Sequence, residues 1–236
     1  MSKWVIMLRN LFSVLALTAL TLGSAQALTI DTFTTNQVVY DSIGGGPTSS
    51  TVSDAVNILG TERTISVEQL GPGATPSSVS INVGTSGLLT LGNTDAYSIS
   101  RIAYNGIGGS GLGGVDVTEG GVLNTFGLLV VLGDFPTNIT LTVSDGTNTA
   151  SLTKPTPSLA INVPLLFEYS SFAGGPVDFT MIDYIAIDLI TKHPLADLQL
   201  AITSFVGTTT VPEPGALAVL GFGLIGLGLV RRKRTT

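Results

Sequence analysis

The sequence predicts an all-β protein with a single β-sandwich of jelly-roll type. Three observations favour this fold class. The chain has 29 glycines and only 11% charged residues, and glycine is unfavourable inside helices. Short segments alternate apolar and polar residues with a period of two, which is typical of strands with one buried face. No segment of the middle region keeps a long helical period of 3.6 residues.

The alternation recurs along the chain. In the sequence ITLTV, Ile139, Leu141 and Val143 share one face and the threonines share the other. Further segments of this kind predict strands at residues 64–69, 78–83, 97–104, 138–144, 182–190 and 198–205. The continuous apolar run FGLLVVL, residues 126–132, predicts a strand covered on both faces.

Turn-forming segments separate these strands. They are rich in Gly, Pro, Asn, Asp and Ser and lie at residues 42–50, 70–78, 105–114, 144–149 and 172–178. About ten short strands in roughly 180 residues favour a sandwich. No repeat of about 20–50 residues is visible, which disfavours a propeller or a solenoid.

The first 27 residues have the three parts of a secretory signal peptide. Two basic side chains precede an apolar segment at residues 11–22. Ala25 and Ala27 then supply the A-x-A spacing that signal peptidase accepts. The apolar segment is short for a membrane span, and the small residues follow it directly. We therefore expect cleavage after Ala27 and a β-sandwich ectodomain at residues 28–206.

The end of the chain divides into a linker, a span and a tail. Residues 207–214 contain threonines and prolines and predict an extended linker. Residues 215–230 carry no charge and predict a short transmembrane helix of about 24 Å, against a hydrocarbon core of about 30 Å. The tail, residues 231–236, begins with the basic run Arg231, Arg232, Lys233 and Arg234. Such a run stays cytoplasmic and leaves the β-sandwich on the outer side of the membrane.

These features together resemble a known sorting signal. The sequence VPEP at residues 211–214, the short apolar segment and the basic cluster resemble the PEP-CTERM signal of exported proteins from Gram-negative bacteria that make extracellular polysaccharide. Pro212, Glu213 and Pro214 match its motif directly. The resemblance implies that an integral-membrane protease of the exosortase type recognises and processes the tail. It says nothing about the β-sandwich. A permanent single-pass anchor is the alternative.

Charge excludes one class of partner. Between residues 28 and 212, four basic and fifteen acidic side chains leave a net charge of −11. A surface this acidic repels phosphate backbones, so we expect no nucleic-acid partner. Neutral, hydroxyl-rich polymers remain compatible. The chain has no cysteine, which excludes disulfides, thiol catalysis and Cys-ligated zinc.

The sequence carries no catalytic signature, and we predict that the protein is not an enzyme. His193 is the single histidine and lies between two predicted strands, where a surface role is expected. No G-x-S-x-G motif occurs. A glycosidase-like pair among the fifteen acids stays open, but nothing in the pattern selects one.

Two binding hypotheses remain for the ectodomain. Asp116 and Glu119, beside a glycine-rich loop, could ligate Ca²⁺ through oxygen atoms; no other cofactor is expected. Aromatic side chains could stack on sugar rings. The candidates, most of which we expect in the core, are Tyr97, Tyr104, Phe167, Tyr169, Phe172 and Tyr184.

The sequence thus predicts a protein exported across the inner membrane, anchored there transiently, and then placed at the cell surface or in the extracellular matrix. The leading interpretation is a non-catalytic structural or adhesive protein associated with exopolysaccharide in a biofilm. The alternatives are a carbohydrate-binding module, with or without calcium, and an extracellular carbohydrate-active enzyme. The expected partners are signal peptidase, an exosortase-type protease and exopolysaccharide.

Overall fold

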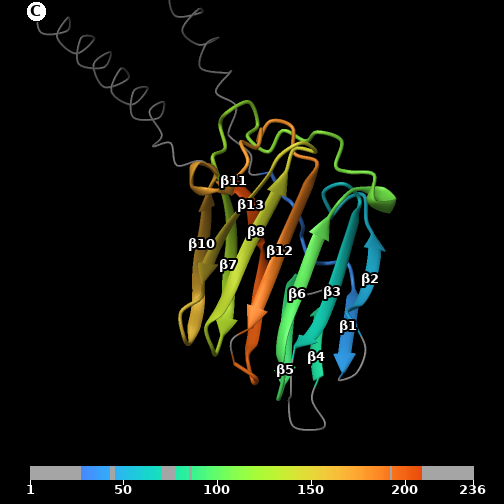
Figure 1. The fold of residues 1–236 in the computed structure, drawn as a ribbon, viewed down its shortest axis with the longest axis vertical. Helices are drawn as coiled ribbons and strands as arrows, with labels where there is room; N and C mark the ends of the chain where they lie inside the picture. The colour runs from blue at the N-terminus through green and yellow to red at the C-terminus, as the bar shows by residue number, and fades with distance from the viewer. Residues whose placement is uncertain (1–27, 43–45, 71–77, 85–86, 192, 209–236) are drawn as a thin grey trace, which may run out of the picture. The chain divides into compact units, whose positions relative to one another are not determined.

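The computed structural model describes residues 28–42, 46–70, 78–84, 87–191 and 193–208. These residues belong to one compact unit, Ala27–Thr209, and form two β-sheets, one in front of the other (Figure 1). The predicted signal peptide, the PEP motif, the predicted transmembrane helix and the basic tail lie outside the described residues. Within the described ranges, no helix is both long enough and apolar enough to cross a membrane.

Both sheets are antiparallel throughout the described pairings. The six-stranded sheet has the order β1-β4-β5-β13-β7-β10. Its strands are β1 (Gln37–Ser42), β4 (Ser78–Val83), β5 (Leu88–Thr94), β13 (Asp197–Thr208), β7 (Thr125–Gly133) and β10 (Ala160–Glu168). The seven-stranded sheet has the order β11-β9-β8-β12-β6-β3-β2. Its strands are β11 (Ala173–Gly174), β9 (Thr149–Pro155), β8 (Thr137–Ser144), β12 (Tyr184–Thr191), β6 (Tyr97–Tyr104), β3 (Glu62–Leu70) and β2 (Thr48–Ser53).

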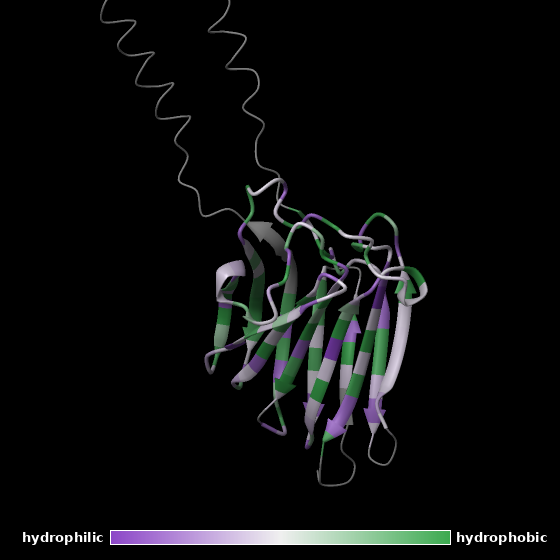
Figure 2. Cartoon of the chain, turned by 45° about the horizontal axis from the view of Figure 1, so that its top comes forward, coloured by the Kyte–Doolittle hydropathy of each residue, from purple (hydrophilic) through white to green (hydrophobic). Residues whose placement is uncertain are grey.

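The core lies between the two sheets. In β8, Ile139, Leu141 and Val143 are at most 1% exposed, while the threonines between them are partly exposed. The same alternation gives the strands of Figure 2 their bands of hydrophobic and hydrophilic residues. Each large apolar side chain that is fully buried contributes about 1.5–3 kcal/mol to folding, so the stacked inner faces hold the sandwich together. The predicted all-β sandwich is confirmed.

Every strand named from the sequence is present. The segments predicted from alternation correspond to β3, β4, β6, β8, β12 and β13, and the apolar run corresponds to β7. The turn segment expected at residues 42–50 is shorter than predicted, because β2 begins at Thr48. β2 has the sequence TSSTVS and lies at the edge of its sheet. Its side chains bury little surface, so alternation gave no signal for it.

The strand β7 is covered on both faces only in its first half. Residues Thr125–Leu128 are buried, whereas Leu132 is 46% exposed. The change occurs beside a β-bulge, where the pairing of β13 with β7 shifts between Gln199 and Leu200. The extra residue, Val131, separates Val130, which is paired with Leu200, from Leu132, which is paired with Gln199 and lies exposed. The expectation of a strand buried on both sides is therefore correct for one half of β7 and wrong for the other.

The last strand extends beyond its expected end. β13 runs to Thr208, two residues into the segment that the sequence assigns to a linker beginning at residue 207. Val206, Gly207 and Thr208 pair with β7. The final strand of the sandwich therefore ends close to the PEP motif in the sequence.

Candidate functional site

The lone histidine has a structural role. The His193 ring stacks on Phe135 with centroids 3.5 Å apart, and its Nδ1 accepts a hydrogen bond from the Leu195 amide at 3.2 Å. These contacts order the turn between β12 and β13. The ring therefore belongs to a turn, as expected, and no carboxylate of the described residues bonds to it.

The calcium hypothesis concerns the loop between β6 and β7. The Asp116 carboxylate accepts hydrogen bonds from the Thr118 hydroxyl at 2.6 Å, the Thr118 amide at 2.8 Å and the Gly120 amide at 2.9 Å. The Thr118 hydroxyl contributes most to lowering the pKa of Asp116, and these donors stabilise its loop. Glu119 has a left-handed backbone with φ of 47°. Among the described residues, no group of three or more His, Cys, Asp or Glu side chains is placed to hold a metal, and the role of Asp116 and Glu119 in metal binding stays a prediction.

Four of the six aromatic candidates belong to the core or to its margin. Tyr104 and Phe167 are at most 1% exposed. Tyr169 stacks on Phe179 with centroids 4.4 Å apart, and Phe172 packs against the same ring. These four rings are therefore engaged inside the protein. Tyr97 and Tyr184 remain as candidates for contact with a ligand.

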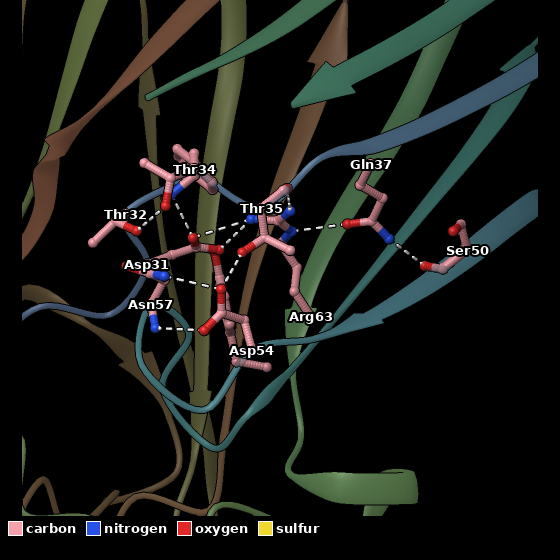
Figure 3. Close-up of polar contacts among 11 residues, drawn as sticks. Asp31, Thr32, Thr34, Thr35, Gln37, Ser50, Asp54, Asn57 and Arg63 are labelled. Carbon is pink, nitrogen blue, oxygen red and sulfur yellow. Dashed lines mark hydrogen bonds and ion pairs between the residues drawn. The ribbon is translucent and has the colours of Figure 1, made fainter. Parts of the chain in front are cut away.

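A buried polar cluster pins the start of the ectodomain to the sandwich (Figure 3). The Arg63 guanidinium is fully buried. It donates from Nη1 to both carboxylate oxygens of Asp31, at 2.8 and 3.0 Å, and from Nε to Gln37 Oε1 at 2.8 Å. The Tyr104 hydroxyl donates to Asp31 at 2.9 Å. Burial raises the pKa of the Asp31 carboxyl, and the Arg63 charge opposes that shift. With every charged atom partnered and inaccessible, this cluster is structural.

The outer faces of the two sheets differ in chemistry. On the six-stranded sheet, exposed apolar side chains gather on β1, β7 and β10, whereas the outward positions of β4, β5 and β13 are mostly polar. The exposed members on its edge strands and β7 are Val38, Tyr40, Leu132, Ile161 and Leu166. On the seven-stranded sheet, serine and threonine predominate at the outward positions of β2, β3, β8 and β9, as follows from alternation along each strand and from the registers of the pairs.

We call this second surface the hydroxyl face. Its serines and threonines are Ser49, Thr51 and Ser53 on β2, Thr64 and Ser66 on β3, Thr140, Thr142 and Ser144 on β8, and Thr149, Ser151 and Thr153 on β9. Hydroxyls on neighbouring strands bond in pairs: Thr51 to Thr64, and Thr140 to Thr153, each at 2.8 Å. Figure 1 looks onto this sheet.

One ion pair lies at the centre of the hydroxyl face. Arg101 on β6 and Asp188 on β12 are direct partners in the sheet register. The guanidinium donates from Nε to Oδ1 at 2.6 Å and from Nη2 to Oδ2 at 2.9 Å. The side chain of Arg101 is 51% exposed, whereas that of Asp188 is 10% exposed. The hydrogen bond to Asp188 is the main cause that raises the pKa of Arg101, so the guanidinium stays charged and fixed in orientation.

Two tyrosines extend this centre along the strands. Tyr97 begins β6, four residues before Arg101, and is 42% exposed. Tyr184 begins β12, four residues before Asp188, and burial raises its pKa. Because the strands are antiparallel, the tyrosines lie on opposite sides of the ion pair. Eight residues at 3.3 Å each separate them by about 26 Å.

The sequence could identify only part of this arrangement. Tyr97 and Tyr184 were aromatic candidates, and Arg101 and Asp188 interrupt strands at outward positions, where a charge is ordinary. The pairing joins residues 87 positions apart in the chain, and no local pattern reveals it. Neither Asp31 nor Arg63 was among the predicted site residues, because burial of an arginine depends on partners from other segments.

Comparison with known proteins adds a finding at the C-terminus. The family model of the PEP-CTERM protein-sorting motif matches residues 210–234. The chain carries a PEP-CTERM sorting motif. The match includes Pro212, Glu213 and Pro214 and confirms the resemblance read from the sequence. The motif implies export, membrane-associated sorting to the surface and processing by an exosortase.

Comparisons over the PEP-CTERM protein's ectodomain are less informative. No curated protein matches the chain. Among solved structures, it is similar to the family 11 carbohydrate-binding module of a cellulosomal cellulase from Clostridium thermocellum, with a TM-score of 0.39, 11% identity, and coverage of 79% of this chain and 97% of that one. The same family's module in complex with a β-1,3-1,4-mixed-linked tetrasaccharide gives a TM-score of 0.38, 13% identity, and coverage of 79% and 99%. What this ectodomain binds has to be argued from its own residues.

Proposed function

We propose that this protein is a non-catalytic component of the cell surface or the extracellular matrix, and that it adheres to exopolysaccharide through the hydroxyl face. The observation that carries the proposal is the composition of that face. On the outer side of the seven-stranded sheet, eleven serines and threonines of β2, β3, β8 and β9 lie on either side of β6 and β12, which carry one ion pair and two tyrosines.

The chemistry of the face fits a polysaccharide better than a protein or a membrane. Protein interfaces are anchored by apolar and aromatic side chains that become fully buried on binding. In this sandwich, most of the exposed apolar side chains on strands lie on the opposite sheet. Membrane surfaces attract basic patches, whereas this ectodomain is acidic. Hydroxyl groups both donate and accept hydrogen bonds, so rows of them can pair with the hydroxyls of sugar rings. Tyrosine adds an apolar ring surface with a polar end.

A non-catalytic role is supported by the engagement of two of the three outward carboxylates on the described strands β3, β6 and β12, which leaves Glu68 without a second free carboxylate on these strands. Glycosidases need two carboxyl groups that flank the scissile bond, one as acid and the other as base or nucleophile. Asp188 is held bidentate by Arg101 and is 10% exposed. Glu62 accepts hydrogen bonds from the Gly108 amide at 2.7 Å and from the Ser53 hydroxyl at 3.3 Å. The carboxylates of Asp188 and Glu62 therefore stabilise the structure through these hydrogen bonds.

The sorting motif supports the proposed place of action. A PEP-CTERM protein is delivered to the surface, where exopolysaccharide is the abundant hydroxyl-rich polymer in organisms of this kind. Adhesion at many weak sites gains strength from multivalency when the protein stays near the surface. No catalytic turnover is then required for the protein to contribute to a matrix.

The test is co-sedimentation of the exported, processed protein with exopolysaccharide isolated from the producing cells. We expect the protein in the pellet at polysaccharide concentrations that leave an unrelated acidic protein of similar size in solution. Reducing ends are measured in the same samples, and we expect no increase over time. Release of reducing ends would show an enzyme, and absence of the protein from the pellet would contradict adhesion.

A further inference from the structure

We propose that the glycan is a neutral chain that runs parallel to β6 and β12, anchored by Arg101 at its centre and by Tyr97 and Tyr184 at its two ends. The inference rests on the proposed function and specifies where on the hydroxyl face binding occurs and to which class of polysaccharide. We call this narrow surface, formed by the outward residues of β6 and β12, the central strip.

Arg101 has hydrogen-bond donors to spare. Its contacts with Asp188 use Nε and one hydrogen of Nη2. No other acceptor among the described residues bonds to the guanidinium, so both hydrogens of Nη1 and one of Nη2 remain directed away from Asp188. Because the carboxylate fixes the plane of the guanidinium, these donors are preorganised, and little side-chain entropy is lost when a ligand accepts them.

The side chains of the central strip on either side of Arg101 and Asp188 are alanine or isoleucine, without charge. On one side of the ion pair, Ala103 faces Ala186 across the two strands. On the other side, Ile99 faces Ile190, and both are partly exposed. Small and apolar side chains let a sugar ring approach the sheet with its C–H face. The tyrosines then close a strip of about 26 Å, long enough for several consecutive sugar residues.

Rows of hydroxyls border the strip on both sides. Thr140 on β8 is paired with Asp188, and Ser66 on β3 is paired with Arg101, so both lie at the level of the anchor. Thr142 and Thr64 flank the two alanines in the same way. A chain lying along the strip therefore meets hydroxyls on each side from the ion pair to Tyr184. On the other half, Asn138 is paired with Ile190 and Glu68 with Ile99, so the chain meets an amide and a carboxylate there. A chain crossing the strands would meet one tyrosine at most.

The charges of the face select a neutral polymer. The outward charges on the described strands β3, β6 and β12 are Glu62, Glu68, Arg101 and Asp188. Among these described outward residues the one positive charge, Arg101, is already neutralised by Asp188, and the ectodomain as a whole is acidic. Polysaccharides that carry carboxylates are repelled by this field. Neutral glycans are not repelled by the negative charge of the ectodomain, and their binding should depend little on ionic strength.

The test is calorimetric titration of the exported protein with oligosaccharides from a neutral β-glucan, a xylan and a mannan, and with alginate oligosaccharides as the acidic counterpart. The main variant is Arg101→Gln combined with Asp188→Asn, which removes both charges and leaves amides that can still pair. We expect its affinity for the preferred neutral glycan to fall about ten-fold. Tyr97→Ala should weaken binding roughly three- to ten-fold.

Two further variants make the experiment decisive. Tyr40→Ala removes an exposed tyrosine from the opposite sheet and should leave affinity unchanged. Arg101→Lys keeps the charge opposite Asp188 but loses the guanidinium fork, and it serves if the double variant fails to fold; we expect weaker binding with an unchanged melting temperature. For wild type, raising the salt concentration ten-fold should change the affinity less than about two-fold.

The outcomes separate this inference from the proposed function. If the wild type binds glycan and the central-strip variants bind equally well, the strip is wrong while adhesion stands. Preference for alginate over every neutral glycan overturns the neutral class. If the wild type binds neither these oligosaccharides nor the exopolysaccharide of the producing cells, the proposed function itself is contradicted. Loss confined to the strip variants supports the inference.

Discussion

Arg63 and Arg101 lie on neighbouring strands of one sheet, and each forms an ion pair with an aspartate. Arg63 donates from Nη1 to both oxygens of Asp31, whereas Arg101 donates from Nε and Nη2 to Asp188. Their side chains lie on opposite faces of the sheet: Arg63 points into the sandwich and is fully buried, whereas Arg101 points outward and is half exposed. The first can only hold the fold together, and the second presents donors to solvent. The face of the sheet on which the arginine lies decides the role of the ion pair.

The buried pair gives a prediction about stability. Asp31→Asn keeps the shape of the side chain and removes its charge, which leaves the Arg63 guanidinium buried without a counter-charge. We expect a loss of about 3–5 kcal/mol in the free energy of unfolding, measured by chemical denaturation. The control is Glu168→Gln at an exposed position at the end of β10, which should change stability by less than about 0.5 kcal/mol. Equal losses in the two variants would show that Asp31 is not a structural partner.

Asp145 gives a prediction about pH. Its carboxylate accepts hydrogen bonds from the amides of Asn148, Thr147 and Asp178, and the Asn148 amide contributes most to holding its pKa well below the usual range. A carboxyl whose pKa is lowered by folding stabilises the protein fully above the unfolded pKa of about 3.9 and loses that contribution as pH falls. We expect the melting temperature to drop below about pH 4.

The variant Asp145→Asn removes the titrating group. Its amide oxygen can still accept the hydrogen bonds of the Thr147 and Asn148 amides, whereas the Asp178 amide, which donates to Oδ2, loses its acceptor. The melting temperature of this variant should fall less steeply over the same pH range than that of the wild type. Identical slopes in the two proteins would mean that other carboxyls govern the acid response.

At the scale of elements, the strands with strong alternation could be predicted and those with weak alternation could not. β8 and β6 bury every second side chain, so their sequences show the period directly. β2 and β9 present hydroxyls on the outside and pack little surface inside, and β10 contains Pro164, which argues against a central strand. β10 lies at the edge of its sheet, where a proline is tolerated. The hydroxyl face could not be predicted either, because serine and threonine are also common in turns. Only the pairing of the strands shows that these residues lie side by side on one face.

The loop between β6 and β7 depends on two glycines in different ways. Gly106 has φ of 63° and ψ of 176°, and a Cβ added there would overlap the backbone of Gly111. Gly108 has φ of 61°, but a Cβ there meets no atom within 4 Å. Gly106→Ala should therefore cost more stability than Gly108→Ala, by about 1–3 kcal/mol in the free energy of unfolding. Similar melting curves for the two variants would contradict this description of the loop.

At the scale of the whole molecule, the two kinds of information come from different parts of the chain. The sorting motif at residues 210–234 is short, local and readable from sequence. The candidate site is assembled from β6 and β12, and the hydroxyls that border it come from β3 and β8. Only the register of the sheet brings them together. Destination could thus be predicted from the sequence, whereas the binding surface required the structure.

Processing gives a prediction at this scale. We expect the protein recovered from the cell surface or the medium to begin at Leu28 and to lack Arg231–Arg234, because signal peptidase and the exosortase each remove one end. Intact-mass spectrometry of the native protein measures both ends at once. A species that retains the basic tail would identify a permanent anchor, and a different N-terminus would move the signal-peptide cleavage site.

We propose that the hydroxyl face holds exopolysaccharide along β6 and β12. Nuclear magnetic resonance of the exported protein, during titration with fragments of the exopolysaccharide made by the producing cells, locates the binding surface residue by residue. We expect chemical-shift changes to concentrate at the Arg101 Nε–H group, the rings of Tyr97 and Tyr184, and the outward residues of β8 and β3. Shifts gathered instead around Val38 and Tyr40 on the opposite sheet, or no shifts at saturating fragment, would contradict this proposal.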